Sequence, residues 1–209
     1  MNIPIIYEDD ALLIVDKPAG LLTIPTPKKE SRTLTSIINA EFKNGSEVFS
    51  FYPCHRLDRE TSGLLVYAKG KAVEKKMSGL FRSHGIKKLY IAFVHGTINR
   101  DKGIIDSPIE GKFAKTEFKV LERRNGFTVS EVIPQTGRTN QIRIHFKGIG
   151  HPLVGEKRFA FRKDFLLKAN RLCLHAARLE FVHPLNNRYI RVESPLPLAM
   201  TNFLQKHPQ

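Results

Sequence analysis

The sequence predicts a mixed α+β fold with a largely antiparallel central sheet, flanked by helices and loops. Several short segments are continuously apolar or alternate between apolar and polar residues, and turn-forming residues separate them, which is typical of antiparallel strands. A few other segments place apolar residues at helical spacing. With 209 residues, of which 41% are hydrophobic, the chain can supply an ordinary buried core. There is no internal repeat or low-complexity tract, so we expect a single domain over residues 1–209.

The N-terminal half predicts a hairpin, two helices and a strand. Residues 3–20 contain two apolar runs on either side of the acidic stretch 8–10, which is a hairpin pattern. Thr33 is a candidate N-cap, because four apolar residues follow it at helical spacing: Leu34, Ile37, Ile38 and Phe42. Residues 63–68 form an apolar run typical of a buried strand. A second helix is indicated by the spacing of Val73, Met77, Leu80 and Phe81.

The C-terminal half predicts an antiparallel series of strands and two further helices. The expected strands cover residues 87–96, 103–109, 116–124 and 127–134. Helical spacing returns at residues 139–150 and again near residues 198–204. A last hairpin joins residues 178–184 to 188–195 around Asn186 and Asn187.

The chain is strongly basic. Lys and Arg outnumber Asp and Glu by 34 to 20, and the resulting net charge of +14 attracts polyanions and favours nucleic acid as the partner. A basic surface that only aids solubility is the alternative that composition leaves open. No segment approaches the ~20 apolar residues of a membrane span, and the start of the chain lacks a signal-peptide pattern. We therefore expect a cytoplasmic protein with no membrane partner.

Residue spacing gives no indication of a metal or a cofactor. Cys54 and Cys173 lie far apart and form neither a disulfide framework nor a four-cysteine zinc motif, which fits a reducing compartment. The histidines of the C-terminal half match no zinc spacing: His145, His151, His175 and His183. Glycine-rich phosphate-binding motifs do not occur in the sequence either. We expect no metal and no cofactor.

The stretch HRLDRETSGLLVYAK, residues 55–69, contains the first candidate site residue. It places Asp58 between Arg56 and Arg59, directly before a Thr-Ser-Gly turn and an apolar strand. Cationic neighbours keep a carboxylate ionised, which suits a nucleophile or a base. The alternative is a surface loop with ordinary salt bridges, and spacing alone favours that alternative.

Two further stretches contain candidate site residues. In TGRTNQIRIH, residues 136–145, Arg138 and Arg143 lie near the start of the expected helix, an arrangement that can bind an anion. Arg143 is also a candidate for a bidentate contact with a carboxylate, although a solvated basic helix face explains both arginines equally well. Tyr90 lies on the expected strand KKLYIAFVHG. Its ring packs in the core or, if it lines a cleft, stacks on a base while its hydroxyl group moves a proton.

Together these stretches resemble a known family. HRLDRETSGLLVYAK is similar to the signature of the RluA-type pseudouridine synthases, enzymes of ribosomal large-subunit and transfer RNA. Further stretches support the resemblance in order along the chain: DKPAG, KKLYIAFVHG, TGRTNQIRIH, GHPLVGEKRF and RLCLHAARLEFVHP. The resemblance covers nearly all of the chain and implies an active-site cleft across the antiparallel sheet. It also implies isomerisation of uridine in RNA without cofactor or metal, on a nucleotide flipped out of the RNA helix.

The resemblance implies roles for three catalytic residues. Asp58 would act at the sugar as a nucleophile or a base. Arg143 would pair with Asp58. Tyr90 would stack on the target ring and is a candidate proton carrier.

The resemblance also implies roles in substrate binding. Arg56 would fill the gap that the flipped base leaves in the RNA. An aliphatic residue of RLCLHA would pack against the target, either Leu174, which we favour, or Leu172. Four more residues of the same motifs are candidates for substrate binding: Arg59, Arg138, Asn140 and Gln141.

The chain departs from the family pattern at Asn140, where most members have His. An amide cannot titrate, so we expect Asn140 to position a neighbour by hydrogen bonding. We also expect no separate N-terminal RNA-binding domain, because DKPAG begins at Asp16. Target selection would then rest on the catalytic domain itself, where the basic segments 26–32 and 71–88 are candidate surfaces.

Two other functions compete with an RNA-modifying isomerase. A catalytically silent RNA-binding or ribosome-assembly protein would keep the fold but would be expected to lack Asp58, Tyr90 or Arg143, and all three are present. A nuclease or phosphoryl-transfer enzyme would normally need clustered carboxylates for Mg²⁺, and only Asp9, Asp10 and scattered acids are available. We expect an active synthase that works as a monomer.

Overall fold

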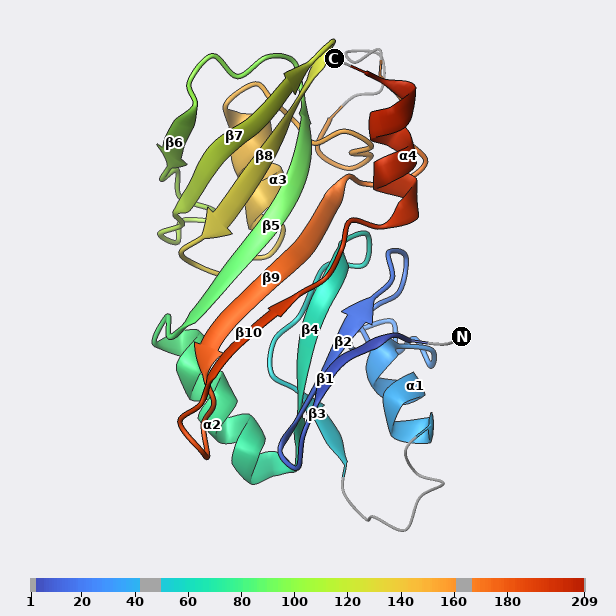
Figure 1. Ribbon diagram of the computed structural model, residues 1–209, viewed down its shortest axis with the longest axis vertical. Helices are drawn as coiled ribbons and strands as arrows, with labels where there is room; N and C mark the ends of the chain where they lie inside the picture. Colours follow the sequence, from blue (N-terminus) through green and yellow to red (C-terminus); the bar gives the residue numbers. More distant parts are fainter. Residues whose placement is uncertain (1–2, 42–49, 161–166, 209) are drawn as a thin grey trace. The chain divides into compact units, whose positions relative to one another are not determined.

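The computed structural model of the protein describes residues 3–41, 50–160 and 167–208 (Figure 1). Helices accompany two sets of antiparallel strands. The predicted α+β fold with largely antiparallel pairing is therefore confirmed. Across the described residues, no helix is both long and apolar enough to cross a membrane.

The chain divides into two compact units. The first consists of Met1–Lys87 and Arg178–Ser194, and the second consists of Lys88–Ala177 and Pro195–Gln209. Strands β9 (Leu174–Val182) and β5 (Ile86–His95) each contribute residues to both units.

The first unit contains strands from both ends of the chain. Its elements are β1 (Ile5–Glu8), β2 (Leu12–Lys17), α1 (Leu34–Glu41), β3 (Phe51–Pro53), β4 (Ser62–Lys69), α2 (Lys71–Arg82) and β10 (Tyr189–Glu193). Strand β2 pairs with β1 and with β4, β3 pairs with β4, and β10 pairs with the C-terminal part of β9. The predicted hairpins, strand and helices of this unit are confirmed. Strand β3 has no counterpart among the predictions, because three residues that include Pro53 carry too little pattern.

Two side chains fix the ends of elements in the first unit. Asp9 Oδ1 accepts hydrogen bonds from the backbone N–H groups of Ala11 (2.8 Å) and Leu12 (2.8 Å), which closes the turn between β1 and β2. Thr33 Oγ1 accepts a hydrogen bond from the backbone N–H of Ser36 (3.1 Å), so Thr33 caps α1 as predicted. Phe42, the last residue of the predicted apolar face, lies outside the described residues.

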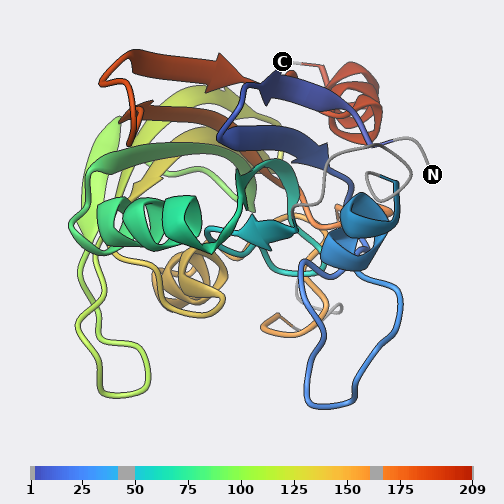
Figure 2. The same cartoon turned by 90° about the horizontal axis from the view of Figure 1, so that it is seen from below.

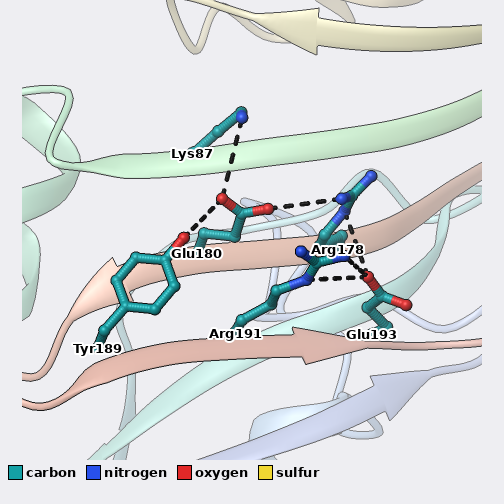
Figure 3. Close-up of polar contacts among 6 residues, drawn as sticks. All are labelled: Lys87, Arg178, Glu180, Tyr189, Arg191 and Glu193. Atoms are coloured by element: carbon teal, nitrogen blue, oxygen red, sulfur yellow. Dashed lines mark hydrogen bonds and ion pairs between the residues drawn. The ribbon is translucent and has the colours of Figure 1, made fainter.

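Alternation along β9 and β10 separates a buried face from a charged face. The buried residues join a core that also includes Met77 of α2: they are Leu179, Phe181, Ile190 and Val192. Figure 3 shows the polar network of the opposite face, in which the Tyr189 hydroxyl donates a 2.7 Å hydrogen bond to Glu180 Oε2. Ion pairs with Glu193 extend this network on β9 and β10. Exposed ion pairs contribute only about 0–1 kcal/mol each, so the network mainly marks a solvated face.

The second unit is built on a four-stranded antiparallel path. Its elements are β5 (Ile86–His95), β6 (Lys102–Ile105), β7 (Thr116–Arg124), β8 (Phe127–Pro134), α3 (Gln141–Gly148) and α4 (Leu198–Lys206). The strands follow the order β5-β8-β7-β6. Helix α3 packs on them through Ile142 and Phe146, and the Phe146 and Phe118 ring centroids lie 5.6 Å apart. Apolar residues of α4, including Phe203, pack in a second cluster with Phe93.

The strand predicted at residues 103–109 is partly wrong, because β6 ends at Ile105. Residues 106–115 form a loop with a tight turn, in which Glu110 has φ 51° and Gly111 has φ 72°. A two-residue turn of this kind needs positive φ at both positions, and Gly adopts it without steric cost. The other strands and helices predicted for the C-terminal half are confirmed.

Gly155 allows two segments of the second unit to approach closely. Its φ is +79°, and a Cβ atom added to it would lie 1.9 Å from the carbonyl oxygen of Arg171. No real side chain tolerates such a distance, so the backbone on one side would have to move. Gly155 therefore allows its segment to lie against Arg171, just before β9.

We predict that Gly155→Ala destabilises the protein by about 4 kcal/mol or more, because it adds a steric overlap to an unfavourable φ. The matched control is Gly150→Ala, whose φ is +84° but whose added Cβ would meet no atom within 4 Å. The control should cost only about 1–2 kcal/mol. Urea unfolding of both variants measures the difference, and equal losses would contradict the close approach.

Candidate active site

Asp58 lies in the loop that connects β3 to β4 in the first unit, and its side chain is half-buried. On its N-terminal side, Thr23 Oγ1 donates to the carbonyl of Leu57 (3.1 Å) and accepts from the Leu57 N–H (3.3 Å). On its C-terminal side, the Asp58 carbonyl accepts a hydrogen bond from the backbone N–H of Thr61 (3.1 Å). The backbone is thus held on both sides of the carboxylate.

The two arginines beside Asp58 are exposed. Arg59 Nε donates to the carbonyl oxygen of Gly20 (3.1 Å), and the Gly20 N–H donates to the Arg59 carbonyl (2.7 Å). These reciprocal contacts tie the DKPAG stretch to the loop of Asp58. Arg56 is available at the surface to meet a partner.

Lys17 makes the second connection between these two stretches. It is not among the residues predicted for the site. Its side chain is fully buried, and Nζ donates to the carbonyl oxygens of Pro18 (2.9 Å), Leu21 (2.7 Å) and Arg59 (3.3 Å). A buried ammonium group is tolerated only when its donors are satisfied, so these carbonyls and the lysine hold one another in place. The signal in the sequence is the place of Lys17 in DKPAG, directly after the apolar run 12–15.

Arg143 lies on the first turn of α3 in the second unit and is buried. Its Nε donates to Glu156 Oε2 (2.7 Å) and its Nη2 to Glu156 Oε1 (2.8 Å), which is a bidentate ion pair. Its Nη1 donates to Asn140 Oδ1 (2.9 Å). The bidentate geometry predicted for Arg143 is confirmed, but with Glu156, a carboxylate that the sequence analysis does not single out. The predicted pairing with Asp58, which belongs to the first unit, stays a prediction.

Glu156 is held as an anion inside the second unit. Its Oε1 accepts hydrogen bonds from the backbone N–H groups of Lys157 (2.9 Å), Arg158 (2.8 Å) and Phe159 (3.3 Å). Burial by itself would raise the pKa of this carboxyl group, but the hydrogen bonds from Arg143 and from these amides outweigh burial and lower the pKa. The Arg143–Glu156 pair is therefore charged at neutral pH.

Asn140 precedes α3 in the left-handed conformation, with φ 54° and ψ 24°. Asn adopts this region more readily than most residues, and here it turns the amide oxygen toward Arg143. This contact agrees with the positioning role expected of Asn140.

Gln141 and Arg138 are anchored to the loop that precedes β7. The Gln141 amide donates to the carbonyl of Lys115 (3.0 Å) and to Thr116 Oγ1 (2.9 Å), and its oxygen accepts from Thr136 Oγ1 (2.6 Å). Gln141 is buried, so these bonds secure the start of α3. Arg138 is exposed, and its Nε donates to the carbonyl of Phe113 (3.0 Å).

Tyr90 and Leu174 belong to one apolar cluster of the second unit, together with Ile142 of α3. Leu174 and its rival Leu172 are both buried, whereas Tyr90 on β5 is only half-buried. The Tyr90 ring is thus partly core and partly accessible. The second unit brings Tyr90, Leu174 and the start of α3 onto the same core, while Asp58 and its two arginines belong to the first unit.

The histidines of the C-terminal half have structural contacts instead of forming a cluster. His145, for example, lies 2.9 Å from Thr116 Oγ1 and 3.0 Å from the carbonyl of Ser107. Within the described residues, no group of three or more His, Cys, Asp or Glu side chains could hold a metal ion.

Comparisons with known proteins agree with these motifs. The sequence model of the RNA pseudouridylate synthase family matches residues 11–148. The uncharacterized RNA pseudouridine synthase YlyB of Bacillus subtilis is 36% identical, over 98% of this chain and 73% of the relative. The dual-specificity RNA pseudouridine synthase RluA of Yersinia pestis is 35% identical, over 86% of this chain and 92% of its own length.

A solved structure shows the same fold. The human RNA pseudouridylate synthase domain containing 4 has a TM-score of 0.82 and 22% sequence identity, over 99% of this chain and 94% of the human one. The family model covers more than half of the chain, and relatives more than 30% identical cover most of it. The chain therefore belongs to the RNA pseudouridylate synthase family.

Proposed function

We propose that the protein is an active RNA pseudouridine synthase that isomerises specific uridines of ribosomal or transfer RNA. The proposal rests on the placement of Asp58. The chain belongs to the family, and its Asp58 lies on a loop whose backbone is held on both sides of this residue. The protein would act as a monomer in the cytoplasm and use no cofactor or metal.

The reaction needs a carboxylate and a proton carrier in a closed pocket. The bond between the uracil nitrogen and the sugar breaks, the base turns, and a ring carbon joins the sugar instead. That carbon loses a proton and the freed nitrogen gains one, so atoms and electrons balance without redox chemistry. Asp58 would start the reaction by attacking the sugar or by removing a proton from it.

Arg143, held by Glu156 and Asn140, would position Asp58. Glu156 and Asn140 hold the guanidinium group of Arg143 in one orientation, and Asp58 would accept hydrogen bonds from it. Because Glu156 balances the charge of Arg143, Asp58 would meet an oriented donor and not an uncompensated cation. Tyr90 would stack on the target ring and move a proton.

The remaining residues would bind the RNA. Arg56 would replace the flipped base in the RNA helix, and Leu174 would pack against the target. Flipping costs a few kcal/mol, which phosphate contacts from exposed cations such as Arg59 and Arg138 would offset. We assign Gln141 a positioning role, because its amide is engaged within the unit.

Asp58→Ala should abolish pseudouridine formation, with a rate loss of at least roughly 100-fold, because no other group replaces the carboxylate. Asp10→Asn, an exposed acid of the same unit, is the matched control and should keep full activity. The assay incubates each protein with RNA from cells that lack it and maps the pseudouridines formed. Activity in Asp58→Ala would contradict the role of Asp58, and a silent wild type would favour the RNA-binding alternative.

Glu156→Gln should lower stability by about 3–5 kcal/mol, because it leaves the buried charge of Arg143 without its counter-charge. Below the unfolding temperature, kcat should fall more than KM rises, since Arg143 would no longer be oriented. The matched control is Glu122→Gln, which breaks a more exposed pair with Arg124 and should change stability by only about 0–1 kcal/mol. Unchanged kcat in a folded Glu156→Gln protein would refute the positioning role.

Lys17→Met should destabilise the first unit by about 3 kcal/mol or more, because three carbonyl groups around a buried side chain lose their donor. It should also reduce kcat at constant KM, since the Asp58 loop loses one anchor. Lys69→Met, at the end of strand β4, breaks an ion pair with Glu8 and serves as the control, with an expected loss of about 1 kcal/mol or less. Denaturant unfolding and steady-state kinetics test both variants, and equal behaviour would exclude a specific role for Lys17.

A further inference from the structure

The loop at residues 106–115 of the second unit has a defined conformation. Figure 2 shows it as the long yellow-green loop between β6 and β7. At its turn, Ile109 and Lys112 exchange two backbone hydrogen bonds of 2.9 and 3.0 Å. The positive φ values of Glu110 and Gly111 between them match a two-residue hairpin turn. Ile109 and Ala114 are buried, so the loop also has its own packing.

Four side chains anchor this loop to the TGRTNQIRIH segment. His145 contacts the carbonyl of Ser107 at 3.0 Å, and Gln141 Nε2 donates to the carbonyl of Lys115 (3.0 Å). Thr136 Oγ1 accepts from the Lys115 N–H (3.0 Å), and Arg138 Nε donates to the carbonyl of Phe113 (3.0 Å). The loop is therefore tied to the same segment that carries Arg143.

The anchored loop presents an aromatic ring to solvent. The side chain of Phe113 is 63% exposed, although the adjacent Ala114 is fully buried. Lys112 and Arg138 are both exposed. Lys112 precedes Phe113 in the chain, and Arg138 contacts the Phe113 carbonyl. Lys115 is half-buried. The loop also bears two exposed acids, Asp106 and Glu110, which reduce the local positive charge.

We propose that this loop is an RNA-binding element in which Phe113 stacks on an unpaired base next to the modified uridine. Lys112 and Arg138 would bind the flanking phosphates. An exposed aromatic ring beside cations is the arrangement that proteins use for single-stranded RNA. Because the two acids offset part of the charge, stacking and not phosphate attraction would supply most of the affinity. This inference rests on the proposed function and names a contact that helps to select its substrate.

Anchoring makes this contact effective. A stacking residue on an unfixed loop would lose conformational entropy when RNA binds, whereas the loop at residues 106–115 is already ordered by its turn and by four side-chain anchors. The same anchors set its distance from the start of α3. The base on Phe113 would therefore lie at a set distance from the start of α3.

The test uses Phe113→Ala and an RNA fragment that carries a uridine mapped as a substrate of the wild type. We expect KM to rise roughly 5- to 100-fold, the effect of losing one stacked base, while kcat changes by less than about 3-fold. Phe113→Trp should restore the wild-type KM, since it keeps an aromatic face. Leu198→Ala removes another exposed apolar side chain of the same unit, 74% exposed, and should change neither constant.

A second readout reports the stacking itself. The fragment carries 2-aminopurine at single positions beside the target, and its fluorescence should be quenched at one of them by the wild type and by Phe113→Trp. Phe113→Ala should not quench it, although its thermal unfolding should match that of the wild type because the ring is exposed.

The outcomes separate this inference from the proposed function. An active wild type with unchanged KM and quenching in Phe113→Ala overturns the RNA-binding loop and leaves the synthase intact. A wild type that forms no pseudouridine in any cellular RNA, yet quenches 2-aminopurine through Phe113 in a single-stranded RNA that contains uridine, retains the loop and refutes the synthase. If Phe113→Ala instead only converts a dimer into a monomer, the ring serves protein association and the inference is wrong.

Discussion

The buried ion pair between Arg143 and Glu156 is the constraint on which the second unit depends. Arg remains protonated at any physiological pH, so α3 can fold with Arg143 inside only if a carboxylate is delivered to it. Glu156 fulfils this condition because three backbone N–H groups orient it and because Gly155 lets its segment approach the residues before β9. The start of α3 and the segment at residues 153–159 are consequently fixed as one piece.

The first unit solves a similar problem with different chemistry. Lys17 is also a buried cation, and it donates to three backbone carbonyl oxygens. One of these carbonyls belongs to Arg59, the residue after Asp58, so Lys17 helps to fix the loop that carries Asp58. Each unit thus contains a buried cation that fixes the segment of a predicted site residue: Lys17 contacts the loop of Asp58, and Arg143 is held by Glu156.

The sequence predicts the elements of this fold well wherever a pattern repeats over several residues. The helix cap at Thr33 and the bidentate behaviour of Arg143 follow from local chemistry, and the structure bears both out. The partners of buried charges could not be predicted in this way, because they depend on which distant segments of the chain meet. Glu156 lies 13 residues from Arg143, and the Arg59 carbonyl lies 42 residues from Lys17, so no local pattern connects them.

The left-handed Asn140 has a consequence for the protons that the reaction moves. A histidine at this position would add a group that exchanges a proton near neutral pH, directly beside the guanidinium of Arg143. With an amide there, the set formed by Arg143, Glu156 and Asn140 keeps the same charge from mild acid to mild alkali. In the proposed reaction, protons would then move between ring carbon and ring nitrogen through Asp58, the hydroxyl of Tyr90 or the solvent. The start of α3 would orient charge without exchanging protons.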